Sequence, residues 1–182
     1  MTSMRRQDAF TLTELLVVVA IVAILLTIAT PGFRFVTNAN RLSAEVNGLL
    51  GDLMYARAEA IRQGAPVVVC TSADSQSCAN VPTWEGGWII CVANAANTCD
   101  NTTAVLRAQK AFTNTDTLRP DAISNATAIT FNRMGFASGM NALGATLTLH
   151  EQTNNSVWTR CLSVTVVGKL SVTNHVATPA CI

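Results

Sequence analysis

The distribution of apolar and polar positions divides the chain into a long apolar segment, an amphipathic segment and a series of short alternating runs. From Phe10 to Ala29 the residues are mainly apolar, and Glu14 is the only one with an ionisable side chain. About 20 such residues in a helix are enough to cross the hydrocarbon core of a bilayer. We therefore predict a transmembrane helix over residues 10–30.

A second helical pattern covers residues 31–63, beyond the helix-breaking pair Pro31-Gly32. Apolar residues recur here with the three-and-four spacing of an amphipathic helix. They are Leu42, Val46, Leu49, Leu50, Leu53, Met54 and Ile61. Gly64 and Pro66 then provide a stop signal. We expect the apolar face to pack on the rest of the protein, and three charged residues to lie on a solvated or subunit-facing side: Arg57, Glu59 and Arg62.

Residues 64–182 consist mainly of short runs rich in β-branched and aromatic residues, which predict strands. The predicted strands are 66–71, 88–92, 105–109, 128–133, 145–150, 157–167 and 169–173. In the run from Val157, alternation places Leu162, Val164 and Val166 on one face and Cys161, Ser163 and Thr165 on the other. This pattern is typical of an antiparallel sheet with one covered side, and the amphipathic helix is the expected cover.

Charge and cysteine content add an orientation and a compartment. Arg5 and Arg6 precede the apolar segment, so the positive-inside rule keeps the N-terminus in the cytoplasm and exports the β-rich head. The formal net charge of +1 gives no general argument for nucleic-acid binding.

Six cysteines, an even number in an exported domain, indicate a disulfide framework. The short loops suggest Cys70 with Cys78, Cys91 with Cys99, and Cys161 with Cys181; a bond between Cys70 and Cys91 on neighbouring strands is the alternative. There is no C-x2-C spacing and the two histidines are far apart, so we expect no metal site and no cofactor.

The N-terminus resembles the class III leader of type IV pilins and of the pseudopilins of type II secretion. In that family, prepilin peptidase cuts before a Phe that is then methylated, and a Glu occupies the fifth mature position. The resemblance implies a leader over residues 1–9, cleavage between Ala9 and Phe10, and an assembly role for Phe10, Glu14 and Pro31. When Phe10 is counted as residue one of the mature chain, Glu14 is at the fifth position and Pro31 at the twenty-second. Ala9 replaces the usual Gly.

Four further segments resemble the GspH/FimT family: residues 53–64, 84–90, 131–135 and 168–169. The resemblance implies an α+β, pilin-like fold in which a long N-terminal transmembrane and amphipathic helix packs on a head of two antiparallel β-sheets stapled by disulfides. Within these segments we interpret Trp84 and Trp88 as packing anchors and not as residues that stack on a ligand.

The same resemblance implies a minor pilin that assembles by its N-terminal helix near the tip of a type IV pilus. Its implied partners are other pilins, prepilin peptidase and the bacterial inner membrane, with a periplasmic head that later becomes extracellular. A minor pseudopilin H of a type II secretion system is the alternative. No Ser/His/Asp grouping, paired carboxylates or nucleotide-binding loop is recognisable, so we expect neither enzymatic activity nor a small-molecule substrate.

DNA capture is a further function that the resemblance implies, because FimT-like minor pilins are associated with natural transformation through a Gly-Arg-x-Arg motif. This chain has Gly168-Lys169-Leu170-Ser171 at that place, so one of the two basic positions is retained. The candidate DNA-binding residues are Lys169, Arg160, Arg133 and His175. The other interpretation, scattered solubilising charges, remains open.

Overall fold

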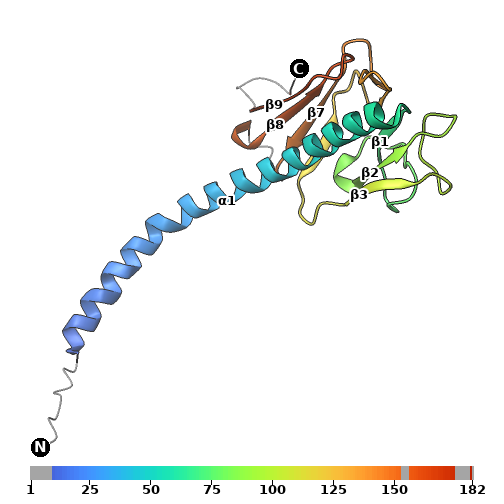
Figure 1. Cartoon of the computed structure of the whole chain (residues 1–182). Helices are drawn as coiled ribbons and strands as arrows, with labels where there is room; N and C mark the ends of the chain where they lie inside the picture. Colours follow the sequence, from blue (N-terminus) through green and yellow to red (C-terminus); the bar gives the residue numbers. More distant parts are fainter. Residues whose placement is uncertain (1–9, 153–155, 175–180, 182) are drawn as a thin grey trace, which may run out of the picture. The chain divides into compact units, whose positions relative to one another are not determined.

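The computed structural model describes residues 10–152, 156–174 and 181. Helix α1, Leu12–Gln63, precedes a head in which nine strands are described (Figure 1). The chain divides into two units, Met1–Asn40 and Arg41–Ile182, and α1 contributes residues to both. Each unit is described here on its own.

In the first unit, α1 begins with a capping interaction. The Thr11 hydroxyl oxygen accepts a hydrogen bond from the Glu14 backbone N–H at 3.2 Å, and the Thr11 carbonyl accepts one from Leu15 at 3.2 Å. The helix passes through Pro31 and Gly32 without a break, so residues 31–63 continue it, as expected of one long N-terminal helix. A proline removes one intrahelical hydrogen bond and a glycine has a low helix propensity, but neither ends α1 here.

No helix in the described part of the chain is both long and apolar enough to cross a membrane. The structure therefore does not confirm the transmembrane helix expected at residues 10–30.

In the second unit, α1 buries one face whose positions are three and four residues apart. The buried residues are Leu42, Val46, Leu49, Leu53, Ala56 and Ala60. The assignment of Met54 and Ile61 to this face was wrong, because their exposed fractions are 51% and 52%. The small side chains of Ala56 and Ala60 are buried on this face instead. The helix ends at Gln63 and Gly64 has φ +66°, as the stop signal predicted.

The first sheet has the strand order β3-β2-β1-β5-β6, with all neighbours antiparallel. Its strands are β1 (Val67–Thr71), β2 (Gly87–Val92), β3 (Val105–Lys110), β5 (Ala128–Phe131) and β6 (Ala137–Ser138). Every residue of the central strand β1 is buried, so the middle of this sheet is covered on both faces, whereas the edge strand β3 is largely exposed. Trp88 is on the helix side, where its indole N–H donates to the Asp52 carboxylate of α1 at 2.9 Å.

The second sheet has the antiparallel order β4-β7-β8-β9. Its strands are β4 (Thr117–Pro120), β7 (Ala145–His150), β8 (Arg160–Val164) and β9 (Leu170–Asn174). Leu162 and Val164 are buried on one face, as alternation predicted. Val166 is 38% exposed because β8 ends before it, in a turn.

Sequence patterns missed or misplaced several elements of the head. The short strands β4 and β6 lie outside all the predicted strands. The expected strand 157–167 is too long, because residues 156–158 form a 3-10 helix, η2 (Ser156–Trp158). A second 3-10 helix, η1 (Trp84–Gly86), begins with Trp84. Trp84 is fully buried and its indole N–H donates to the Ala126 carbonyl at 2.8 Å, which confirms its role as a packing anchor.

All six cysteines form disulfides, with the three local pairings: Cys70–Cys78, Cys91–Cys99 and Cys161–Cys181. The alternative bond between Cys70 and Cys91 does not form. Cys91 lies opposite Val68, not Cys70. Diagonal neighbours on one face of a sheet are about 7 Å apart, which exceeds the Cβ separation of a disulfide.

Candidate functional site

Two of the expected assembly residues, Phe10 and Glu14, lie at or just before the start of α1, and Pro31 lies further along the same helix. Phe10 and Glu14 are exposed, and Phe10 reaches 81% exposure. Because the Thr11 hydroxyl accepts from the Glu14 N–H, Thr11 caps the helix and Glu14 is the third helical residue after it, where a carboxylate is favoured by the helix dipole. This local role is compatible with a role in assembly. Ala9, on the other side of the expected cleavage point, lies outside the described residues.

In the head, three of the family-like segments converge around Arg57. Its Nε donates to the Gly135 carbonyl at 3.0 Å, which joins α1 to the turn between β5 and β6. Gly168, in the turn between β8 and β9, lies against both: a Cβ added there would be 2.1 Å from the Gly135 oxygen and 2.9 Å from the Arg57 Nε. Arg57 therefore ties the β5–β6 turn to the helix by a hydrogen bond and lies against the β8–β9 turn. It is partly buried, where a solvated or subunit-facing position was expected.

Glu59 also differs from expectation, because it is 7% exposed and was predicted on a solvated side. Its carboxylate accepts hydrogen bonds from the Arg62 guanidinium and the Gln63 amide, one helical turn further on. The bond from Arg62, followed by that from Gln63, lowers the pKa of Glu59 to about 2. The three-residue spacing to Arg62 is the sequence signal that could have revealed this pair.

A third polar cluster lies where the head begins. The Arg41 guanidinium donates to both oxygens of the buried Asp116, at 2.9 and 3.1 Å. Nearby, Glu45 accepts from the Asn114 amide at 2.6 Å with one oxygen. The other oxygen of Glu45 is buried and has no hydrogen-bond partner among the described residues. Burial raises the pKa of Glu45; the bond from Asn114 opposes this effect and the charge of Asp116 adds to it. The sequence carried no signal for this cluster.

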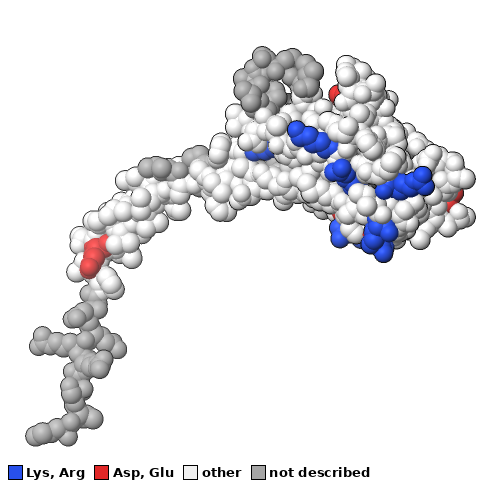
Figure 2. Space-filling view, turned by 45° about the horizontal axis from the view of Figure 1, so that its top comes forward, with Lys and Arg blue, Asp and Glu red and all other residues white. Residues whose placement is uncertain are grey.

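The structure brings together only two of the candidate DNA-binding residues. Lys169 and Arg133 are exposed, and they lie in the two turns that meet at Gly168 and Gly135. Arg160 pairs with Asn174 at the far end of the β8–β9 hairpin, about 15 Å from the turn that carries Lys169. His175 lies outside the described residues. Figure 2 shows a face of the head on which Lys and Arg side chains gather while Asp and Glu are sparse.

A surface cleft of about 580 Å³ adjoins Lys169. It is lined by α1 and the β8–β9 turn, through Met54, Arg57, Ala58, Ile61, Val167, Gly168, Lys169 and Leu170. Sequence analysis missed this cleft because it assigned Met54 and Ile61 to the core.

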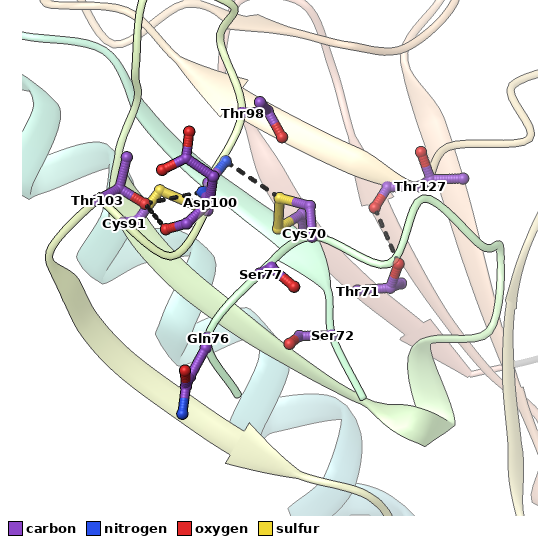
Figure 3. Close-up of a disulfide and its surroundings, with 12 residues drawn as sticks. Cys70, Thr71, Ser72, Gln76, Ser77, Cys91, Thr98, Asp100, Thr103 and Thr127 are labelled. Atoms are coloured by element: carbon purple, nitrogen blue, oxygen red, sulfur yellow. Dashed lines mark hydrogen bonds between the residues drawn. A yellow bond between two sulfur atoms is a disulfide. The ribbon is translucent and has the colours of Figure 1, made fainter. Parts of the chain in front are cut away.

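One group of side chains in the described part of the chain has the spacing of a metal site. The sulfur atoms of Cys70, Cys78 and Cys99 lie within 4.8 Å of one another. All three are in disulfides, so none is available as the thiolate that a metal requires. Figure 3 shows Cys70 and Cys91 close together over the sheet, with Asp100 beside them. The group is therefore part of the disulfide framework.

Comparisons with known proteins give two sequence matches. The sequence model for the family described as "Type II transport protein GspH" matches residues 45–168. The model for the "Prokaryotic N-terminal methylation motif" matches residues 4–30, which include Phe10 and Glu14. No curated protein matches the chain.

Solved structures similar to this chain include the type IV minor pilin FimU of Pseudomonas aeruginosa, at 21% identity and a TM-score of 0.61 over 79% of this chain and 96% of that chain. The minor pseudopilin EpsH from the type 2 secretion system of Vibrio cholerae is also similar, at 11% identity and a TM-score of 0.51 over 72% of this chain and 95% of that chain. At these identities the likeness establishes the pilin-like fold. The methylation motif, the α+β fold and the match over most of the head together show that this chain belongs to the GspH family of pilin-like proteins.

Proposed function

We propose that this protein is a minor pilin of a type IV pilus, which its N-terminal helix inserts into the filament as a priming or tip component. The observation that supports this most is the presence, in one chain, of the N-terminal methylation motif and a GspH head. Such a chain is made as a precursor, cleaved by prepilin peptidase and assembled with other pilin-like subunits.

Before assembly, the apolar part of α1 is held in the inner membrane in a single pass, with the N-terminus in the cytoplasm and the head in the periplasm. The large apolar residues along this part of the helix are exposed in the isolated chain, including Leu16, Val19 and Leu25 at 60–63%. Such exposure of apolar surface indicates that lipid or neighbouring subunits cover it. The positive charges of Arg5 and Arg6 support the orientation.

Glu14 guides docking in this proposal. A carboxylate among apolar side chains in a membrane or a helix bundle requires a partner. The methylated amino terminus of Phe10 in an adjacent subunit is a cation of the right charge, and Glu14 is the only acidic residue between Phe10 and Asn40. Pairing of these two groups would set the axial register of the new subunit.

Mass spectrometry of the full chain, made in a bacterium that has prepilin peptidase, tests the processing. The expected mature chain begins at Phe10 and carries one added methyl group. Glu14→Gln, which keeps the shape and removes the charge, should still be cleaved but should be lost from sheared filaments. The neighbouring change Thr13→Val serves as the matched control and should be incorporated normally. A chain that retains Met1 and never enters filaments would refute the proposal.

The secretion pseudopilin is the alternative function, and it shares the features described so far. Deletion of the gene separates the two. Loss of surface pili with normal release of secreted proteins supports the minor pilin, whereas accumulation of those proteins in the periplasm supports the pseudopilin.

DNA capture is an additional function within this proposal. It is supported by the exposed side chains of Lys169 and Arg133, which lie in two neighbouring turns. A phosphate-binding site must weaken as salt concentration rises, because bound counterions are released. A gel-shift titration of the purified protein with duplex DNA should therefore show salt-sensitive binding that Lys169→Ala reduces. Absence of salt-sensitive binding would remove DNA capture and leave the assembly function intact.

A further inference from the structure

The cleft beside Lys169 is surrounded by large apolar side chains that face solvent. On α1, Met54 and Ile61 are 51% and 52% exposed, and in the β8–β9 turn Val167 is 56% exposed. Met134 and Phe136, which flank Gly135 in the adjoining turn, are 65% and 46% exposed. Soluble protein surfaces seldom gather so many exposed apolar groups unless the surface binds a partner.

The scaffold under this surface is well defined. The Arg57 side chain joins the helix to the Gly135 carbonyl, and the Ala137 N–H donates to the Val166 carbonyl at 2.9 Å, so the β5–β6 and β8–β9 turns are tied to each other as well as to α1. On the helix, Met54, Arg57, Ala58 and Ile61 form a stripe beside the buried face, because their spacing is three, one and three residues. The cleft is therefore a fixed feature of the head.

The charge of the cleft is positive. Arg57 and Lys169 line it, and Arg133 lies in the adjoining turn. Among the described residues, no Asp or Glu forms an ion pair with any of these three cations. A partner that fits must offer an apolar surface together with at least one carboxylate.

A second copy of this chain fits poorly, because its own carboxylates are already in use. Every Asp and Glu in the described part of the head interacts with groups of its own chain. Duplex DNA fits less well than a protein does. DNA-binding surfaces are polar and strongly basic, whereas five exposed apolar side chains surround this cleft.

We propose that the cleft between α1 and the β8–β9 turn is the docking surface for a different pilin-like subunit, which inserts an apolar segment bearing a carboxylate between Met54, Val167 and Lys169. This inference rests on the proposed assembly function and assigns one of its contact surfaces. The apolar groups of the partner cover Met54, Ile61 and Val167, and its carboxylate meets Lys169 and the exposed part of Arg57.

Site-specific photo-crosslinking of the full chain in assembled filaments tests the location. A photoreactive amino acid at Val167 should crosslink to a pilin-like subunit through a segment that contains an Asp or Glu. The same amino acid at Ile123, which is 80% exposed in the β4–β5 connection, is the matched control and should give no crosslink to that segment. Crosslinks from Val167 to DNA alone, or to no subunit in filaments that contain the chain, overturn the proposal.

Charge reversal tests the chemistry. Lys169→Glu and Val167→Asp should each lower the amount of the chain in sheared filaments by about tenfold, as expected for disruption of a close charge pair or an apolar contact. Lys110→Glu, at an exposed position of β3, should have no such effect. Equal incorporation of all three variants overturns the docking site. If the wild-type chain is correctly processed but absent from filaments, the proposed assembly function is refuted, whatever the variants show.

Discussion

Replacement of Gly168 by Ala tests the junction that holds the two turns against α1. Gly168 has φ +75°, a left-handed conformation that costs a residue with a side chain about 1–2 kcal/mol. The added Cβ would also lie 2.1 Å from the Gly135 oxygen, and that oxygen belongs to the backbone. Relief of such a clash costs about 1–3 kcal/mol, so the substitution should lower the free energy of unfolding by about 2–5 kcal/mol.

Urea unfolding of the full chain, followed by tryptophan fluorescence, measures this effect, because Trp84 and Trp88 are 0% and 2% exposed in the folded head. A loss of this size should lower the melting temperature by about 6–20 °C for a head of this size. Gly51→Ala is the matched control. Gly51 lies on the exposed side of α1 with nothing within 4 Å of an added Cβ, so the same change there should stabilise the protein by about 0.5–1 kcal/mol. If both variants unfold at the wild-type urea concentration, the described contact between Gly168 and Gly135 is refuted.

Three further predictions concern the stability of the head. Leu49→Ala removes a fully buried side chain and should lower the free energy of unfolding, measured with urea, by about 2–5 kcal/mol. Met54→Ala, at an exposed position of the same helix, should change it by no more than about 0.5 kcal/mol. Equal effects of the two substitutions would contradict the described helix faces. Replacement of Cys161 and Cys181 by Ser opens a loop with a separation of 20 residues and should lower the free energy of unfolding by about 3 kcal/mol; an unchanged unfolding midpoint would count against this disulfide. The pKa of Glu45 is raised in the folded state, so the folded chain binds more protons than the unfolded chain, and the free energy of unfolding should fall as pH rises from the ordinary pKa of 4.5 through the raised pKa. Glu45→Gln should remove this fall and match the wild type only in more acidic solution. Urea unfolding midpoints measured across the pH range test this prediction.

Features that depend on neighbours in the sequence were largely predictable. Gly64 ends the helix because its conformation and the following proline are local properties. The short disulfide loops were also recognisable, since Cys70 and Cys78 are 8 residues apart. Strand β4 was missed because it lies in a stretch rich in Asn and Thr, and its pairing with β7 comes from a distant part of the chain.

Burial along α1 shows where the pattern of apolar residues becomes ambiguous. Met54 and Ala56 are both compatible with a buried helix face, and hydrophobicity alone favours the larger side chain. In the structure the small side chains of Ala56 and Ala60 are fully buried, whereas Met54 and Ile61 line the cleft. This choice depends on the distance between layers, which no local signal encodes.

The sequence by itself determined the apolar N-terminal segment with its methylation motif and the extent of the helix beyond it, because each of these depends on residues close together in the chain. It suggested the local disulfides but left a bond between Cys70 and Cys91 open, and the structure decided between them. Only the tertiary structure decided which residues share a surface. The register of the β8–β9 hairpin separates Arg160 from Lys169, and the meeting of two distant turns at Arg57 places Lys169 beside an apolar cleft. Such proximity arises from long-range strand pairing and packing, whose geometry the spacing of residues along the chain does not specify.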